Sequence, residues 1–379
     1  MSHYPEGISV IVPTEGRPQL TARLLQGIVQ ARVAVDAPVE VLVVDSSDGQ
    51  AQATIHDACR TASAVYLSGS TNVREKRNQG LRLARYSVVL FLDSDCTPRP
   101  DLLAAHWQHY AAGCRQIGGV VGQTIFEGPQ GLAWRMVEQT SLVAHFTQAA
   151  DHESVCWGTT SNISFRHDVI DEVGVFDTEF PFRLGGDDLD LSYRVSRRGY
   201  VLRADAQAVV LHSRSTWNSL PSVLRRALRW GRTEYYLFRK HPSARVVAPP
   251  DLFGWLILVA ALFGFQALAL GSALYLVLIP IWFVMALLLF ALPATATAAA
   301  GSPARRLGRH FLGSIPELTY RLGVAAEFLR HGDLRFMWSR AWFDPRAPSD
   351  NWPYEAWNLW SNLIALLACQ GLLLVWSVR

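Results

Sequence analysis

The stretch VVLFLDSDCTP, Val88 to Pro98, places five consecutive apolar residues directly before two aspartates. An apolar run without a polar face predicts a strand buried on both sides in a mostly parallel sheet, here Val88 to Leu92. Ligands of such sheets bind outside the carboxyl ends of the strands, where Asp93 and Asp95 lie. Two adjacent carboxylates repel each other unless a cation lies between them, and Mg²⁺ or Mn²⁺ with a substrate diphosphate suits such a pair. A strand that ends in a solvated turn is the alternative.

The composition favours a large core together with a membrane-associated part. Hydrophobic residues make up 50% of the 379 residues, and a net charge of only +3 gives no sign of nucleic-acid binding. The five cysteines are widely spaced and form no Cys-x-x-Cys pair, which favours reduced thiols and argues against a zinc site. No N-terminal signal peptide is visible, because Met1 to Gly7 is short and polar.

The second half of the chain contains two adjacent stretches without a charged residue, 252–270 and 273–292, and a third apolar run at 357–377. Each is long enough for a helix that crosses the hydrocarbon core of a membrane. We therefore expect a membrane region at 246–379 with about three transmembrane helices.

The loop between the second and third of these runs, 295–355, is rich in arginine, and the positive-inside rule places it in the cytoplasm. Two crossings separate the loop from the N-terminal domain at 1–245, which is then cytoplasmic as well. The mixture of apolar, aromatic and basic residues from Phe311 to Trp338 fits an interfacial helix or a loop helix packed on the protein.

The N-terminal part alternates predicted strands with predicted helices. Ile8 to Val12 and Val39 to Val44 are apolar runs that predict strands, and a helix begins near Pro18. Polar residues follow each strand, which is the doubly wound pattern of a nucleotide-binding fold. No glycine-rich dinucleotide motif and no P-loop motif follows either strand. Asp45, after the second strand, is expected to accept hydrogen bonds from a base or ribose, or to cap the next turn.

A short strand at Ala64 to Leu67 precedes a predicted helix at Asn72 to Tyr86. Arg74, Lys76 and Arg77 lie in its first turns, where cations oppose the helix dipole. A bound anion would explain them, and a solvated basic face is the alternative.

Together, the segments ISVIVPTEGRP, VLVVDSSDG, REKRNQG and VVLFLDSDCTP resemble the donor-binding half of the inverting glycosyltransferases of family 2. That family has the GT-A fold and includes cellulose, chitin and hyaluronan synthases and many bacterial envelope-sugar transferases. The resemblance covers residues 8 to 240. It implies an α/β, nucleotide-diphosphosugar-transferase-like domain, followed here by a C-terminal helical membrane region, and a requirement for Mg²⁺ or Mn²⁺.

The resemblance also implies roles for individual residues on the donor side. The implied residues are Pro13, Thr14 and Asp45 for the nucleoside, Arg77 for the diphosphate, and Asp93 and Asp95, the Asp-x-Asp motif, for the ribose and the metal. Ser46 stands where the family usually has a second aspartate.

Two later segments resemble the acceptor side of the family. GTTSNISFR contains Asn162, and GGDDLDL resembles a Gly-Glu-Asp-x-Asp-Leu motif in which Asp188 would be the catalytic base and Asp187 replaces the glutamate. A sugar hydroxyl has a high pKa and must lose its proton as it attacks, which a carboxylate at a helix start can accept. The alternative is an acidic N-cap, by Asp187, for a helix at Leu189 to Arg198.

Two further sets of residues have implied roles. His212 follows a predicted strand at Ala208 to Leu211 and resembles a histidine that joins the metal in several relatives, with a structural role as the alternative. Arg226, Arg229 and Trp230 resemble a Gln/Arg-x-x-Arg-Trp motif whose arginine faces the diphosphate and whose tryptophan lines the acceptor site. A basic, aromatic interfacial helix is the alternative for these three.

These features predict a hexosyltransferase-type enzyme that transfers a sugar, with inversion, from a UDP-, GDP- or dTDP-sugar to a hydroxyl acceptor at the cytoplasmic face of the cell membrane. The membrane region favours an acceptor that is a lipid-linked or membrane-associated glycan. A processive polysaccharide synthase and a non-catalytic nucleotide-sugar-binding membrane protein remain open. Charge-free spans argue against a transporter.

Overall fold

The computed structural model describes residues 4–138, 140–181, 184–297, 303–343 and 352–377. The chain forms two compact units. The first comprises Met1–Trp134 and Ser141–Ser222, and the second comprises Arg135–Thr140 and Val223–Arg379.

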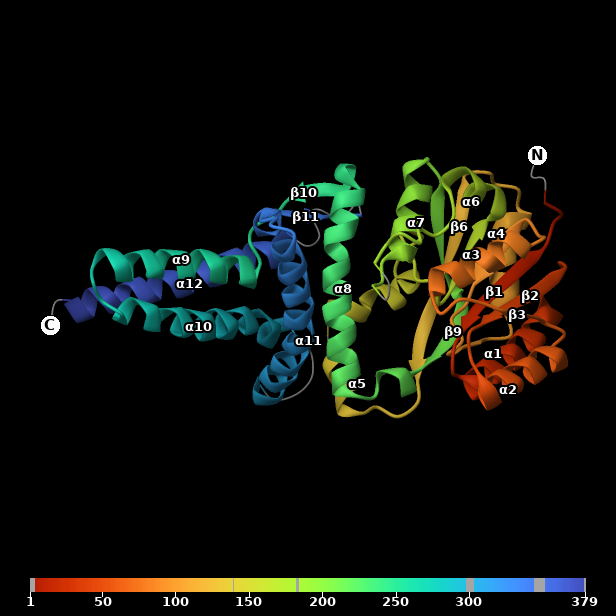
Figure 1. Ribbon diagram of the computed structural model, residues 1–379, viewed down its shortest axis with the longest axis horizontal. Helices are drawn as coiled ribbons and strands as arrows, with labels where there is room; N and C mark the ends of the chain where they lie inside the picture. The colour runs from red at the N-terminus through yellow and green to blue at the C-terminus, as the bar shows by residue number, and fades with distance from the viewer. Residues whose placement is uncertain (1–3, 139, 182–183, 298–302, 344–351, 378–379) are drawn as a thin grey trace. The chain divides into compact units, whose positions relative to one another are not determined.

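The first unit is built around a mixed sheet, which in the described residues has nine strands in the order β3-β2-β1-β4-β8-β6-β9-β5, with β7 paired to β9 (Figure 1). The strands are β1 Ile8–Thr14, β2 Val39–Asp45, β3 Val65–Ser68, β4 Val88–Phe91, β5 Cys96–Pro98, β6 Ile117–Glu127, β7 Ser154–Val155, β8 Ile163–Arg166 and β9 Val201–Ser213. Strands β1 to β4 pair in parallel, as predicted. The other half of the sheet is mixed: β6 pairs with β9 in parallel, whereas β8 runs antiparallel to β4 and β6, and both β5 and β7 run antiparallel to β9. The prediction of a mostly parallel sheet is therefore correct for only part of it.

Helices cover both faces of this sheet, which is why its central strands are apolar on both sides. One face, with Val10 and Val12, packs against α1 (Pro18–Ala31), α2 (Gly49–Thr61) and α4 (Leu102–Ala111). The opposite face, with Ile11 and Phe91, packs against α3 (Val73–Leu83), α6 (His167–Val173) and α7 (Asp187–Arg197). A short helix, α5 (Leu132–Val137), follows β6.

Two predicted helices begin at other residues than expected. The helix α3 begins after Asn72, because the Asn72 side chain accepts a hydrogen bond from the Arg74 backbone N–H at 3.1 Å and caps the helix. The helix α7 begins at Asp187, and Gly186, with a φ of 88°, occupies the N-cap position. This left-handed conformation favours glycine, so the alternative of an N-cap at Asp187 is wrong.

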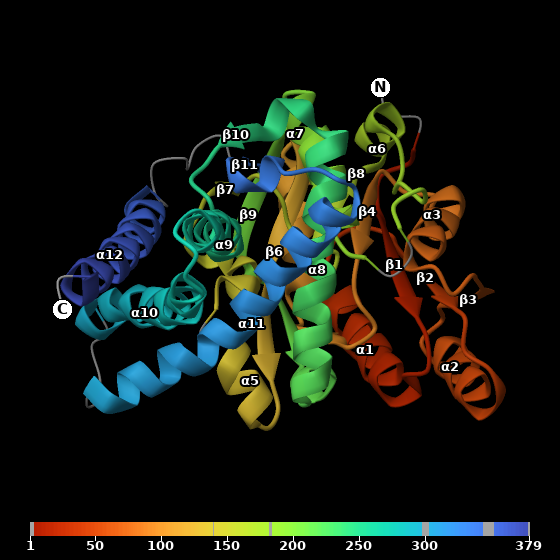
Figure 2. The same ribbon diagram turned by 60° about the vertical axis from the view of Figure 1, so that its left-hand side comes forward.

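The second unit contains long helices and a two-stranded ribbon. Its helices are α8 Leu220–Lys240, of which Val223 onward belongs to this unit, α9 Leu252–Ala269, α10 Leu274–Thr297, α11 Pro303–Arg330 and α12 Trp352–Ser377. Strands β10 (Arg245–Val247) and β11 (Ser339–Ala341) pair antiparallel. Helices α9, α10 and α12 lie side by side in Figures 1 and 2 and share a core that includes Phe263, Trp282 and Cys369.

Helices α9, α10 and α12 occupy the three positions at which spans were predicted. Within the described residues, one of them, α9, is long and apolar enough to cross a membrane. The apolar parts of the other two that fall in that portion of the chain, Leu274–Leu289 and Leu359–Leu373, are shorter. The membrane region therefore stays a prediction. In α11, Val324 and Phe328 are buried, so this part of the helix packs on the protein, which was one of the two alternatives.

Helices α8 and α11 touch at two glycines. A Cβ atom on Gly231 would lie 1.9 Å from the backbone oxygen of Tyr320, and one on Gly323 would lie 2.3 Å from that of Leu228. Because backbone atoms make this contact, no change of rotamer can accommodate a methyl group.

We expect Gly231→Ala to lower the free energy of unfolding by about 1–3 kcal/mol or more, seen as a lower thermal midpoint of the purified protein. Gly264→Ala on α9 is the control, since no described atom lies within 4 Å of its Cβ position. Equal midpoints for the two variants would contradict a close crossing of α8 and α11.

Candidate active site

The carboxyl ends of three parallel strands bring the predicted donor-side residues together. Thr14 at the end of β1 lies opposite Asp45 at the end of β2, and β4 leads directly into Asp93 and Asp95. Pro13 and Thr14 are buried within β1. The sheet topology thus gathers these residues from segments far apart in the sequence.

Asp45 is held in a fixed orientation. Its Oδ1 atom accepts hydrogen bonds from the backbone N–H of Ser47 at 2.9 Å and from the Ser47 hydroxyl at 2.6 Å, and its Oδ2 atom accepts one from the Tyr66 hydroxyl at 3.0 Å. Asp45 therefore caps the turn that follows β2, which was one of its two predicted roles. Ser46 Oγ, beside it, is buried and has no hydrogen-bond partner among the described residues.

Arg17 belongs to the same group, although it was not predicted. Its Nη1 atom donates to Asp95 Oδ2 at 2.8 Å, and the Arg17 side chain is 41% exposed while that of Asp95 is 5% exposed. The sequence did contain a signal for Arg17, because this residue lies in PTEGRP, directly after the first predicted strand. The carboxyl end of that strand is at the same edge of the sheet as Asp95.

Asp95 and His212 face each other without a hydrogen bond between them. The Nε2 atom of His212 lies 3.4 Å from Asp95 Oδ1, and its Nδ1 atom lies 3.1 Å from the carbonyl oxygen of Ser213. Because a carbonyl oxygen only accepts, Nδ1 carries the hydrogen, so in a neutral ring Nε2 would be a second acceptor facing the carboxylate. Asp95 Oδ1 is buried and has no hydrogen bond within the described residues. Such a pair fits a divalent cation.

Three potential ligands of a divalent cation lie close together at this point. The ligand atoms of Asp95, Cys96 and His212 lie within 4.8 Å of one another. Burial raises the pKa of the Cys96 thiol well above its ordinary value, and the charges of Asp95 and Asp93 add to this. Carboxylate oxygens suit Mg²⁺ or Mn²⁺, and an imidazole nitrogen is an acceptable ligand for Mn²⁺.

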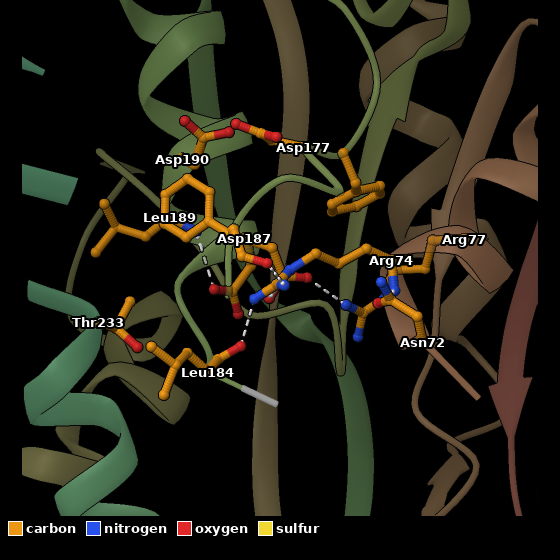
Figure 3. A network of polar contacts seen from close by, with 12 residues as sticks. Asn72, Arg74, Arg77, Asp177, Leu184, Asp187, Leu189, Asp190 and Thr233 are labelled. Atoms are coloured by element: carbon orange, nitrogen blue, oxygen red, sulfur yellow. Dashed lines mark hydrogen bonds and ion pairs between the residues drawn. The ribbon is translucent and has the colours of Figure 1, made fainter. Parts of the chain in front are cut away.

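Arg77 connects the Asp-x-Asp motif to the start of α7. Its Nη1 atom lies 2.5 Å from Asp187 Oδ2 and its Nη2 atom lies 3.3 Å from Asp93 Oδ1, and the side chain is 6% exposed. Figure 3 shows Arg77 and Arg74 directed at Asp187. Burial raises the pKa of the Asp93 carboxyl, the Arg77 guanidinium opposes that rise, and the Asp95 carboxylate adds to it.

The alternative of a solvated basic face on α3 is wrong. Arg74 and Lys76 are buried, as Arg77 is. Arg74 donates to the carbonyl oxygens of Phe180, at 3.0 Å, and of Leu184, and Lys76 Nζ donates to that of Thr14 at 2.5 Å. The three cations thus bind protein oxygens.

Asp187 and Asp188 have different surroundings. Asp187 is buried and paired with Arg77, and its Oδ1 atom lies 3.7 Å from Arg74 Nε. Asp188 is half-buried and accepts a hydrogen bond from the Leu189 backbone N–H at 2.9 Å. No cation of the described residues, which leave out 182 and 183, pairs with Asp188. Burial and the charge of Asp187 raise the pKa of Asp188 to about 7, which suits a general base near neutral pH.

We expect the kcat/KM of the protein to follow the titration of Asp188. A base acts only when deprotonated, so log(kcat/KM) should rise with pH, with a slope of about 1, and level off above the pKa. With the Asp188 pKa at about 7, the rising limb should lie below that pH. The measurement is the pH profile of nucleotide release, and a profile that is flat down to pH ~5 would contradict a raised pKa for the essential base.

Asn162 does not join this group. Its Nδ2 atom donates to the carbonyl oxygens of Gln123 at 3.0 Å and Ala208 at 2.8 Å, and its Oδ1 atom lies 2.9 Å from His106 Nε2. The side chain is buried and ties β6 to β9, and its assignment to the acceptor side stays a prediction.

Arg226, Arg229 and Trp230 lie on α8 in the second unit, whereas the donor-side residues belong to the first. All three are half-buried. Their roles toward the diphosphate and the acceptor stay predictions.

Comparison with known families identifies the class of the protein. The model of glycosyl transferase family 21 matches residues 71–311, more than half of the 379 residues. The chain belongs to glycosyl transferase family 21. The predicted enzyme class, glycosyltransferase, is confirmed, while the family that matches is 21 and not family 2.

Curated relatives of this family 21 glycosyltransferase are also sugar transferases. The pre-mycofactocin glycosyltransferase of Mycobacterium tuberculosis is 26% identical over 259 residues, which are 66% of this chain and 52% of that protein. The chondroitin synthase of Escherichia coli is 26% identical over 246 residues, which are 55% of this chain and 34% of that protein. The chain spans about half or less of the length of these relatives.

The fold of the family 21 glycosyltransferase resembles that of a solved enzyme. The mannosyltransferase PcManGT of Pyrobaculum calidifontis, solved with GDP-Man and Mn²⁺, aligns with a TM-score of 0.52 and 19% identity over 87% of this chain and 89% of that one. At this identity the likeness shows the fold, a GT-A-like α/β domain.

Proposed function

We propose that this family 21 glycosyltransferase moves a sugar from a nucleoside-diphosphate sugar to a hydroxyl acceptor with inversion at the anomeric carbon. The observation that carries the proposal is the buried bridge from Asp93 through Arg77 to Asp187. It joins the donor-side carboxylates to the helix start that bears Asp188, whose pKa is raised to about 7. A base and a donor site within one packed group are what direct displacement requires.

In this mechanism the chain's residues have separate tasks. Asp188 accepts the proton of the acceptor hydroxyl as that oxygen attacks the anomeric carbon. The bond from this carbon to the diphosphate oxygen breaks as the new bond forms, so the configuration inverts in a single step without a covalent enzyme intermediate. Arg77 positions Asp187 and Asp93, and the strand tip with Thr14 and Asp45 takes the nucleoside.

A divalent cation is part of the proposal. Asp93, Asp95 and His212 would hold Mg²⁺ or Mn²⁺, which when bound supplies positive charge for the departing diphosphate. The orphaned Asp95 Oδ1 atom beside His212 Nε2 supports this assignment. Because PcManGT was solved with GDP-Man and Mn²⁺, a GDP-sugar with Mn²⁺ is the first combination to test.

Nucleotide release by the purified protein tests the proposed transfer. UDP-, GDP- and dTDP-sugars are offered with Mn²⁺ or Mg²⁺, with and without a membrane lipid extract as acceptor. We expect release from one donor that depends on the extract. A donor that binds without turnover would replace the transferase by a binding protein, and failure of all donors to bind would overturn the site assignment.

We further propose that α9, α10 and α12 anchor the protein in the cell membrane, with the first unit in the cytoplasm and a lipid-linked acceptor. On α9, Phe265 is 71% exposed and Leu268 is 86% exposed, which is unfavourable in water and natural in lipid. Cys114 is exposed in the first unit, so a membrane-impermeant maleimide should label it only after lysis. Labelling in intact cells that is lost in Cys114→Ser would overturn the cytoplasmic placement.

A further inference from the structure

We infer that Arg17 is a stand-in cation, which holds Asp95 while the donor site is empty and moves to the diphosphate of the nucleotide sugar when a divalent cation binds at Asp95. The inference rests on the proposed function, because it assigns a further residue to the same site. It makes Arg17 a donor-binding residue, whose guanidinium contacts either a carboxylate or a diphosphate, depending on what is bound.

The two arginines that reach the Asp-x-Asp motif differ in their freedom to leave it. Arg77 is 6% exposed and is bound by two carboxylates, Asp93 and Asp187. Removing it would leave buried charges unpaired, which is strongly unfavourable. Arg17 is 41% exposed and pairs with Asp95 alone among the described carboxylates. Because its guanidinium is partly solvated, it can exchange one partner for another at low cost.

Asp95 is arranged for this exchange. Its Oδ2 atom accepts from Arg17 at 2.8 Å, whereas its buried Oδ1 atom has no hydrogen bond in the described residues and faces His212 at 3.4 Å. A cation bound by Asp95 and His212 would therefore compete with the guanidinium for the charge of one carboxylate. When no divalent cation is bound, the Arg17 guanidinium supplies the positive charge that balances the Asp95 carboxylate.

The backbone keeps the released side chain at the site. The N–H of Gly16 donates to Ser47 Oγ at 2.7 Å, and the Thr21 hydroxyl donates to the carbonyl oxygen of Arg17 at 2.9 Å. Gly16 has a φ of 65°, a conformation that glycine adopts readily. With the turn fixed, only the long side chain of Arg17 needs to move. Its planar fork of donors then matches the oxygens of a diphosphate, which is proposed to lie at the same strand tips.

The inference is tested with Mn²⁺ alone and then with GDP or UDP in the presence of saturating Mn²⁺, on the full chain. Mn²⁺ affinity is measured by electron paramagnetic resonance and nucleotide affinity by calorimetry. We expect Arg17→Gln to bind Mn²⁺ about tenfold more tightly than wild type, because no guanidinium has to be displaced, and to bind the nucleotide about tenfold more weakly. A purely structural role would weaken both. Arg17→Lys should recover part of the nucleotide affinity.

Arg23→Gln is the matched control. Arg23 lies on α1, is 52% exposed and pairs with Glu127 at 2.5 Å, so its loss should change neither affinity. Unchanged or weaker Mn²⁺ binding by Arg17→Gln, beside a wild type that binds both probes, would overturn the inference and leave the proposed function standing. A wild type that binds neither Mn²⁺ nor any nucleotide would overturn both.

Discussion

Replacing Asp188 by asparagine should lower kcat for sugar transfer by about 10²–10⁴-fold while changing donor affinity by less than about threefold. The substitution keeps the size of the side chain and removes the group that accepts the proton of the acceptor hydroxyl. Steady-state nucleotide release gives kcat, and calorimetry with the nucleoside diphosphate gives the affinity. Asp101→Asn, an exposed carboxylate at the start of α4, is the control and should retain wild-type kcat.

Comparing Asp187→Asn with Asp188→Asn distinguishes the roles of the two aspartates at the start of α7. Asp187 is paired with Arg77, so its loss should lower the thermal midpoint as well as the rate. Asp188 has no ion pair within the described residues, and its raised pKa means that the ionised carboxyl destabilises the fold near neutral pH. Asp188→Asn should therefore not lower the midpoint. If Asp188→Asn kept more than about one-tenth of wild-type kcat, Asp188 would not be the base.

Removal of the Arg77 side chain should have the largest effect on stability. In Arg77→Ala the carboxylates of Asp187 and Asp93 lose their shared cation, and breaking a buried ion pair in this way costs about 3–5 kcal/mol. We expect a fall of about 10 °C in the thermal midpoint of the full chain.

The control for Arg77→Ala is an exposed ion pair. Arg60 and Asp57 are 78% and 67% exposed, so Arg60→Ala should change the free energy of unfolding by no more than about 1 kcal/mol. Equal thermal midpoints for the two variants would show that the Arg77 bridge stabilises the first unit no more than an exposed ion pair does.

The parallel half of the sheet was predictable because each of β1, β2 and β4 is an apolar run that ends in polar residues. The other half was not. Strand β6 contains Gly118, Gly119 and Gly122, which interrupt an apolar pattern but allow close packing: a Cβ on Gly122 would lie 2.3 Å from both the Ala208 backbone oxygen and Asn162 Nδ2. The pairing of β6 with β9 and with β8 depends on contacts between distant segments, which local patterns do not encode.

The sequence points to candidate site residues where a short motif carries their chemistry, as at Asp93, Asp95 and Asp188, and their roles stay predictions. The site was not predictable where the partner is distant: Arg77 pairs with Asp187 across 110 positions of the sequence, and Arg17 with Asp95 across 78. Without those partners, the first turns of α3 have the pattern of a solvated basic face. The same limit affected the prediction of the family. Short motifs at the strand tips indicated a glycosyltransferase, but they pointed to family 2 instead of family 21.

The anomeric configuration of the first product tests direct displacement by a hydroxyl that Asp188 deprotonates. A donor sugar of known configuration is converted by the wild-type protein, and the linkage formed is read by NMR before it can equilibrate. We predict a linkage opposite in configuration to the donor. A linkage of the same configuration would contradict the single displacement, and with it the role of Asp188 as the base.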